Sequence, residues 1–220
     1  MTTAVENLEL VERRRGQIVA AATELFAERG FYRTTIKEIA AKAGVSAGLV
    51  YLYFREKEDV LLLVLLQVLE AYACEIPKAI EGIDDPLERL LAAFDSYCRV
   101  VDTHRAPTVL AYRSTKSLPS GRREMVQKRE TETNEIFSSA ISECIKAGIV
   151  REVNVDILTY QVVLAAHGWA LKGWYWKSRM SLDKYVAESI DTLISGALTD
   201  EGRRRFDTYR EATLTAARVL

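Results

Sequence analysis

Histidine, cysteine and proline are scarce in this chain of 220 residues, which has two histidines, three cysteines and four prolines. Cys74, Cys98 and Cys144 form no CxxC pair and have no histidine at metal-ligand spacing. We therefore expect a reduced, cytoplasmic protein that folds with no disulfide, no metal and no cofactor. Glu6 and Glu9 stand where a signal peptide needs an apolar run, so export is not expected.

Signals for β-strands are also missing, because the sequence has no alternating run of β-branched and aromatic residues and no Asn-Gly or Asp-Gly step. We therefore predict an all-α fold. Each of Pro77, Pro86, Pro107 and Pro119 is expected where a helix stops or restarts. The predicted helices are 11–29, 35–43, 46–52, 57–75, 86–104, 107–117, 121–147, 155–177 and 182–198, with a polar tail helix near 201–217.

Two apolar segments raise the question of a membrane. Val60–Leu69 is about half the roughly 20 residues that a bilayer requires. Ile157–Trp176 is long enough but carries Gln161, His167 and Lys172. We interpret both as buried helices and expect no membrane association.

Charge is unevenly distributed, although the net charge is only −1. Between residues 13 and 55, eight basic residues stand against three acidic ones. A local excess of this kind suits a polyanion such as nucleic acid. The sequence shows no nucleophile paired with a base and no phosphate-binding glycine loop, so we do not expect an enzyme.

The predicted helices fall into two domains, a helix-turn-helix DNA-binding domain at residues 1–56 and a ligand-binding and dimerisation domain at residues 57–220. The first helix carries one apolar stripe and ends at Gly30, where a left-handed cap is favoured. That stripe consists of Ile18, Ala21, Ala22, Leu25 and Phe26.

The pattern after Gly30 predicts a helix-turn-helix. Thr35 and Glu38 have the spacing of a capping box, which starts a short helix. Gly44 supplies the tight turn, and Ser46 caps a second short helix. The second helix of such a motif lies in the major groove of DNA. Its outer face would present Ala47, Gly48, Tyr51 and Leu52.

Residues 30–61, GFYRTTIKEIAAKAGVSAGLVYLYFREKEDVL, resemble the signature of the tetracycline-repressor (TetR) family. Members typically have a Gly-aromatic pair, Thr-Thr, Ile-Ala, Ala-Gly-Val-Ser, Tyr-x-Tyr-Phe and Lys-Glu-x-Leu at these spacings. The match is dense over about 30 residues. It implies a dimeric regulator that binds double-stranded DNA, with a helical ligand-binding domain of variable sequence.

The resemblance implies roles for matching positions. Thr35 and Ser46 would offer hydroxyl and backbone N–H groups to phosphates, although Thr35 could act only as a cap. Ala47 and Leu49 stand where members often have polar side chains, so base reading would rely on thymine methyls, Lys37 and DNA shape. The predicted DNA-binding residues are Thr35, Lys37, Ser46, Ala47, Gly48, Tyr51, Tyr53 and Lys57. The residues predicted to be core are Ile39, Ala40, Val45, Val50 and Phe54.

The larger domain combines aromatic and isolated polar residues, which suits an apolar cavity with a few orienting groups. Arg113 and Lys116 would lie on one helical face and could neutralise an acid, or they could simply be solvated. The hypothesis is an apolar effector with an acidic group, such as a fatty acid or an acyl-coenzyme A (acyl-CoA). The predicted ligand-binding residues are Tyr72, Phe94, Tyr97, His104, Tyr112, Arg113, Lys116, Phe137, His167 and Trp169. Each histidine could equally be a satisfied core residue.

The resemblance also implies a homodimer that pairs helices 155–177 and 182–198 of two copies. Small residues such as Ala165 and Gly168 would permit close approach, although they could serve only the core of one chain. A dimer would place two reading helices in successive major grooves of a near-palindromic operator, and an effector would release it by favouring another conformation. The alternatives are an activator, a regulator controlled by a protein partner, and a helical scaffold.

Overall fold

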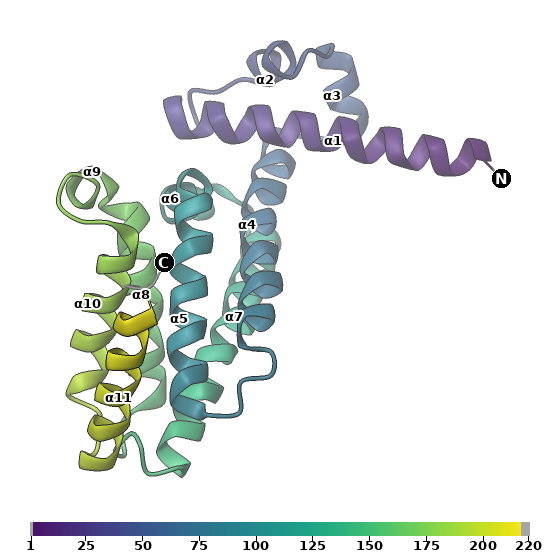
Figure 1. Ribbon diagram of the computed structural model, residues 1–220. Helices are drawn as coiled ribbons and strands as arrows, with labels where there is room; N and C mark the ends of the chain where they lie inside the picture. Colours follow the sequence, from purple (N-terminus) through teal and green to yellow (C-terminus); the bar gives the residue numbers. More distant parts are fainter. Residues whose placement is uncertain (1, 217–220) are drawn as a thin grey trace. The chain divides into compact units, whose positions relative to one another are not determined.

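The computed structural model describes the backbone of residues 2–216 and the side chains of residues 9–212. Every regular element in this range is helical, apart from one isolated bridge between Val150 and Leu198, which confirms the all-α prediction (Figure 1). The elements are α1 (Thr2–Arg29), α2 (Ile36–Ala43), α3 (Ala47–Tyr53), α4 (Lys57–Ile80), α5 (Pro86–Thr103), α6 (Arg105–Ser114), the 3₁₀ turn η1 (Thr115–Ser117), α7 (Ser120–Lys146), α8 (Val155–Leu171), α9 (Gly173–Trp176), α10 (Leu182–Ser195) and α11 (Asp200–Ala216).

Some helix boundaries differ from the sequence prediction. Pro77 lies inside α4, so the expectation that it ends a helix was wrong. Pro77 has no N–H to donate to the carbonyl of Ala73, so α4 lacks one hydrogen bond three residues before it ends at Ile80. The predicted helix 155–177 is divided, because Lys172 leaves helical geometry with φ −116° and ψ 27° and separates α8 from α9.

Helix α4 is longer than the apolar segment Val60–Leu69 from which no membrane span was expected. With 24 residues, α4 is long and apolar enough to cross a bilayer by length and composition alone. The core helix of a soluble protein passes the same test, and α4 buries apolar side chains along its length. These are Val60, Leu61, Val64, Leu65, Val68, Leu69, Tyr72 and Ile76.

The chain forms two compact units. The first contains the residues up to Glu70 together with His104–Arg129, and the second contains Ala71–Thr103 and the residues from Glu130 onward. Both α4 and α7 therefore contribute one segment to each unit.

The first unit is built on the packing of α1 against α2 and α6, with α2 also contacting α3. Phe26 and Phe31 meet edge to face at 5.4 Å at the end of α1. The apolar stripe predicted for α1 is buried, and α2 and α3 add Ile39, Ala40 and Val50 to the same core. Burial of each large side chain contributes about 2 kcal/mol to folding.

In the second unit, α5 packs against α8 and α10, which also contact each other (Figure 1). The segment before α11 is anchored by backbone hydrogen bonds, from Arg151 N to Ala197 O at 2.8 Å and from Thr199 N to Ile149 O at 3.0 Å. Gly202 allows α11 to approach, because a Cβ there would overlap the carbonyl oxygen of Ile149.

Candidate functional site

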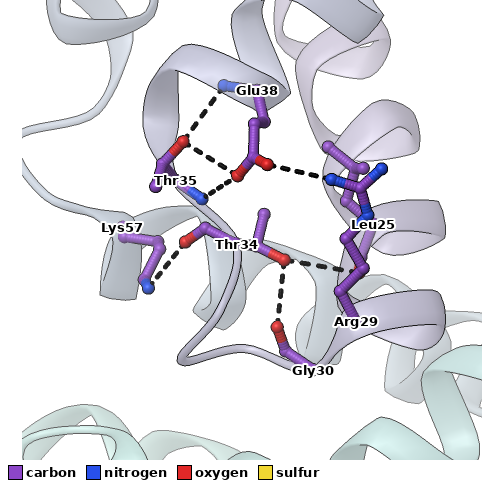
Figure 2. A network of polar contacts seen from close by, with 7 residues as sticks. All are labelled: Leu25, Arg29, Gly30, Thr34, Thr35, Glu38 and Lys57. Carbon is purple, nitrogen blue, oxygen red and sulfur yellow. Dashed lines mark hydrogen bonds and ion pairs between the residues drawn. The ribbon is translucent and has the colours of Figure 1, made fainter.

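The start of α2 is fixed by the predicted capping box (Figure 2). Thr35 Oγ1 accepts a hydrogen bond from Glu38 N at 3.3 Å, and Thr35 N donates to Glu38 Oε2 at 2.8 Å. Arg29 at the end of α1 pairs with Glu38 Oε1 at 2.9 Å. These hydrogen bonds and the ion pair lower the pKa of the Glu38 carboxyl, with the bond from the Thr35 backbone as the largest cause. The carboxylate therefore links α1 to α2.

A second network holds the loop between α1 and α2 (Figure 2). Thr34 is fully buried, and its hydroxyl donates to Gly30 O at 2.9 Å. Lys57 Nζ donates to Phe31 O and Thr34 O, both at 2.8 Å, and lies 4.4 Å from the centre of the Phe31 ring. The first residue of α4 therefore holds the loop that precedes α2.

The turn between α2 and α3 has the predicted geometry. Gly44 adopts φ 67°, in the left-handed region, and Val45 N donates to Ala40 O at 3.0 Å. Ser46 Oγ accepts from Leu49 N at 3.1 Å and caps α3. The motif is thus a helix-turn-helix whose orientation is set by local hydrogen bonds.

The outer face of α3 is apolar and exposed. Tyr51 is 58% exposed and Leu52 is 75% exposed, while Val50 on the opposite face is buried. Gly48 is exposed, and a Cβ there would meet nothing closer than 3.9 Å. The fold does not require glycine at this position, so its small size is free to serve close approach by another molecule.

The predicted DNA-binding residues occupy different environments. Lys37, Ser46, Gly48 and Tyr51 are exposed, whereas Ala47, Tyr53 and Lys57 are half-buried. The donors of Thr35, its N–H and its hydroxyl, both go to Glu38. The ammonium of Lys57 goes to loop carbonyls. Their phosphate contacts remain predictions, and the structure gives both residues a scaffolding role.

Three side chains that support the helix-turn-helix of α2 and α3, which we call the reading head, were not predicted from the sequence. The Arg122 guanidinium pairs with Glu56 and Asp59 at the start of α4. Ser117 Oγ donates to the Tyr32 hydroxyl at 2.8 Å. Both contacts join positions more than 60 residues apart, so no local sequence pattern predicts them. Buried Thr34 could have been suspected from the Thr-Thr pair.

A buried aromatic hub in the second unit gathers four predicted ligand-binding residues. The Tyr97 ring lies 4.6 Å from Tyr72, 5.4 Å from Phe137 and 5.2 Å from His167, measured between centroids. The Tyr97 hydroxyl and His167 Nε2 share a hydrogen bond of 2.7 Å. Burial lowers the pKa of His167 to about 4, so the imidazole is neutral at pH 7.

Polar groups continue this hub along α7. Asn134 lies one turn before Phe137 and is buried, and neither its amide oxygen nor its amide nitrogen has a partner among the described residues. Glu130 lies one further turn back, where burial raises the pKa of its carboxyl. An unpaired buried amide costs about 1–3 kcal/mol, which a bound polar group would relieve.

The other predicted ligand-binding residues are not in this hub. Trp169 Nε1 donates to Asp102 Oδ1 at 2.5 Å, and its ring lies 5.0 Å from Tyr185. Phe94 is fully buried. Four residues belong to the other compact unit, where His104 is half-buried and the remaining three are exposed, namely Tyr112, Arg113 and Lys116.

Of the two helices predicted for dimerisation, α8 has an apolar exposed side. Ile157, Tyr160 and Leu164 are exposed at helical spacing on α8. The small residue Gly168 faces Tyr185 of the same chain, and its role in a dimer stays a prediction. Tyr185 of α10 donates its hydroxyl to Ala165 O at 2.6 Å, and a Cβ on Gly168 would lie 2.8 Å from the same hydroxyl.

Within the described part of the chain, no group of three or more His, Cys, Asp or Glu side chains could hold a metal ion. Cys98 and Cys144 are buried, which raises the pKa of both thiols, and Cys74 is exposed.

Two family models match this chain. The model of bacterial regulatory proteins of the tetR family matches residues 18–64. The model of a tetracyclin repressor-like C-terminal domain matches residues 83–197.

Similar proteins include the HTH-type transcriptional regulator HbdR of Aromatoleum sp. (strain CIB), which is 49% identical over 91% of this chain and 88% of its own. The HTH-type transcriptional repressor KstR2 of Mycobacterium tuberculosis is 26% identical over 87% of this chain and 96% of its own. Among solved structures, AibR in complex with isovaleryl coenzyme A and operator DNA has a TM-score of 0.73 at 18% identity, covering 81% of this chain and 97% of AibR.

Proposed function

This chain belongs to the TetR family of bacterial regulatory proteins, and from that membership we propose that it is a cytoplasmic transcriptional repressor released by a small molecule. It binds a near-palindromic operator as a dimer, through a DNA-binding domain at residues 1–56. The domain at residues 57–220 binds the effector and forms the dimer.

The observation that carries the DNA-binding role is the outer face of α3. A leucine that is 75% exposed and a tyrosine that is 58% exposed lie next to a glycine that the fold does not require, so this face is not part of the core formed by the described residues. In a major groove, Leu52 contacts thymine methyl groups and Tyr51 reaches bases or phosphates. The exposed Ser46 hydroxyl and Lys37 add phosphate contacts.

The test is a titration of fluorescent duplex from upstream of the gene, followed by anisotropy at several salt concentrations. Because Tyr51 and Leu52 are exposed, their replacement by alanine leaves thermal stability unchanged and abolishes specific binding. Met125→Ala, an exposed apolar residue of the same unit, is the matched control and binds normally. Weak binding that ignores sequence in the parent protein overturns the DNA-binding role.

The dimer rests on the exposed stripe of Ile157, Tyr160 and Leu164 on α8, which a second copy would bury. Leu164→Glu places a charge in that interface and yields monomers that still fold, as measured by sedimentation and circular dichroism. Leu10→Glu, at an exposed apolar residue of α1, remains dimeric as the control. A parent protein that is monomeric at micromolar concentration refutes this arrangement.

The effector is an acyl-CoA or a related apolar acid, because the Tyr97 and His167 hub is a buried aromatic cluster and Asn134, one turn from Phe137, has an unpaired amide. The amide would pair with a carbonyl such as that of a thioester. AibR, a relative in fold, was crystallised with isovaleryl coenzyme A, which makes this chemistry the first to test.

Release follows from linkage, because an effector can weaken operator binding only if it prefers a conformation whose two reading helices are wrongly spaced. Aliphatic, branched and aromatic acyl-CoA thioesters are titrated by calorimetry and into the protein–operator complex. Asn134→Leu tests the contact of the buried amide with the effector, and Lys146→Ala is the exposed control. Arg113→Ala separately tests the prediction that Arg113 neutralises an acid. If no thioester binds, the effector class is wrong. If a thioester strengthens the protein–operator complex, it acts as a co-repressor or the protein is an activator.

A further inference from the structure

The connection between α8 and α10 carries a concentrated patch of aromatic and basic side chains. We name Lys172, Trp174, Tyr175, Lys177 and Arg179 the aromatic–basic patch. Trp174 is 78% exposed, the largest exposed fraction among the large hydrophobic side chains of the described residues. Its ring lies 5.8 Å from that of Tyr175, and the Arg179 guanidinium stacks on Tyr175 at 3.9 Å. The Trp174 indole is thus exposed and set edge to face, at 81°, against a tyrosine ring that carries a guanidinium on its face.

The patch has one sign of charge. Residues 171–182 include three basic side chains and no acidic one, in a protein whose net charge is −1. No carboxylate pairs with Lys172, Lys177 or Arg179 in the part of the chain that the structure describes. The next acid along the chain, Asp183, is bound to Arg99 at 2.8 Å. The patch therefore lacks counter-charges of its own and suits an anion.

The geometry points to the nucleotide of coenzyme A as the occupant, an inference that rests on the proposed acyl-CoA effector. Adenine is a flat ring that stacks on an exposed indole, and the 3′-phosphate and diphosphate carry the charges that three cations neutralise. Duplex DNA fits less well, because its bases are stacked on one another and offer no free face to Trp174.

The position of the patch along the chain agrees with this occupant. His167 of the buried hub lies on α8, and Trp174 of the patch lies seven residues later on α9, beyond the break at Lys172. Four helical residues rise about 6 Å and the next three residues span at most about 11 Å, so the two Cα atoms lie within about 17 Å, a distance that the pantetheine arm between the acyl group and the nucleotide can span. The acyl group would occupy the hub and the nucleotide would remain at the surface.

The experiment uses nucleotide probes that contain no acyl group. Coenzyme A, dephospho-coenzyme A and adenosine 3′,5′-bisphosphate are titrated by calorimetry into the full-length protein and into six variants, two of which are Arg113→Ala and Lys116→Ala. Coenzyme A should bind more tightly than dephospho-coenzyme A. Trp174→Ala should weaken coenzyme A binding about tenfold, and Trp174→Phe should restore most of it. Lys172→Ala with Lys177→Ala should remove the preference for the 3′-phosphate, whereas Lys146→Ala should change nothing.

Several results would overturn the inference. One is equal binding of coenzyme A to the parent and to Trp174→Ala. Another is a loss confined to Arg113→Ala or Lys116→Ala, which would place the phosphates on the other cations. A monomeric Trp174→Ala would assign the patch to a dimer contact. If acyl-CoA still releases the operator while the patch variants behave like the parent, only this inference fails. If no coenzyme A compound binds, the proposed effector class fails as well.

Discussion

The buried imidazole of His167 makes the stability of the protein depend on pH in a calculable way. His167 is 6% exposed, and burial lowers its pKa from 6.5 to about 4. Between these two values the unfolded chain binds a proton that the folded chain excludes. Stability therefore falls as the pH falls through this window, and it is regained on return to pH 7.

The magnitude follows from the two pKa values. One pKa unit corresponds to about 1.4 kcal/mol, so lowering the pH from 7 to 4 removes about 3 kcal/mol of folding free energy through this side chain. This is a large fraction of the 5–15 kcal/mol that typically stabilises a domain.

The assay is urea unfolding at fixed protein concentration from pH 7 to pH 4, monitored by circular dichroism. Carboxyl groups also titrate in this range, so the parent is compared with His167→Gln, which has the same carboxyl groups and no imidazole there. We expect the parent to lose about 3 kcal/mol more than the variant. Parallel curves would refute the reasoning.

A second measurement does not depend on the folding of His167→Gln. The chain has two histidines, so His104→Gln leaves His167 as the only imidazole. Its C2 proton resonance, followed by NMR in the folded protein, should not titrate between pH 7 and 5.5. A midpoint near 6.5 would show that the imidazole is accessible to solvent protons.

Three further substitutions test the packing and the hub. Gly202→Ala should lower the unfolding free energy by about 2 kcal/mol and expose the amides of α11 to hydrogen exchange, because the added Cβ meets the Ile149 backbone. Gly121→Ala, whose Cβ has open space, should change neither quantity. Lys57→Met should cost about 2 kcal/mol in urea unfolding by removing charged hydrogen bonds to the loop, and Lys37→Met, an exposed control, should be neutral. Asn134→Leu should raise the melting temperature of the unliganded protein, because it removes a buried unpaired amide, and a lower value would mean that the amide is already paired.

The parts of the fold that the sequence predicted are those encoded within a few residues. Three such features are the capping box of Thr35 and Glu38, the left-handed Gly44 and the cap at Ser46. Each depends on groups no more than five residues apart, so a short sequence pattern predicts it. The helical periodicity of α1 predicted its buried face for the same reason.

The parts that the sequence did not predict depend on contacts between distant segments. Lys57 was assigned to phosphate from the family pattern, yet its ammonium meets carbonyls 23 and 26 residues earlier. The hydrogen bond between Tyr97 and His167 spans 70 residues. Residue type identified both as candidates for a polar cavity, but only the packing of α5 against α8 shows that they meet.

The bond of Lys57 to the loop has a consequence for how a signal could reach DNA. Because the first residue of α4 is tied to the carbonyls that precede α2, the reading head has no independent pivot at that joint. A torque applied to the beginning of α4 must turn the loop, α2 and α3 as one piece. Regulation would then change the distance between two intact heads and leave the internal order of each untouched, so amide exchange in α2 and α3 should be the same with and without effector.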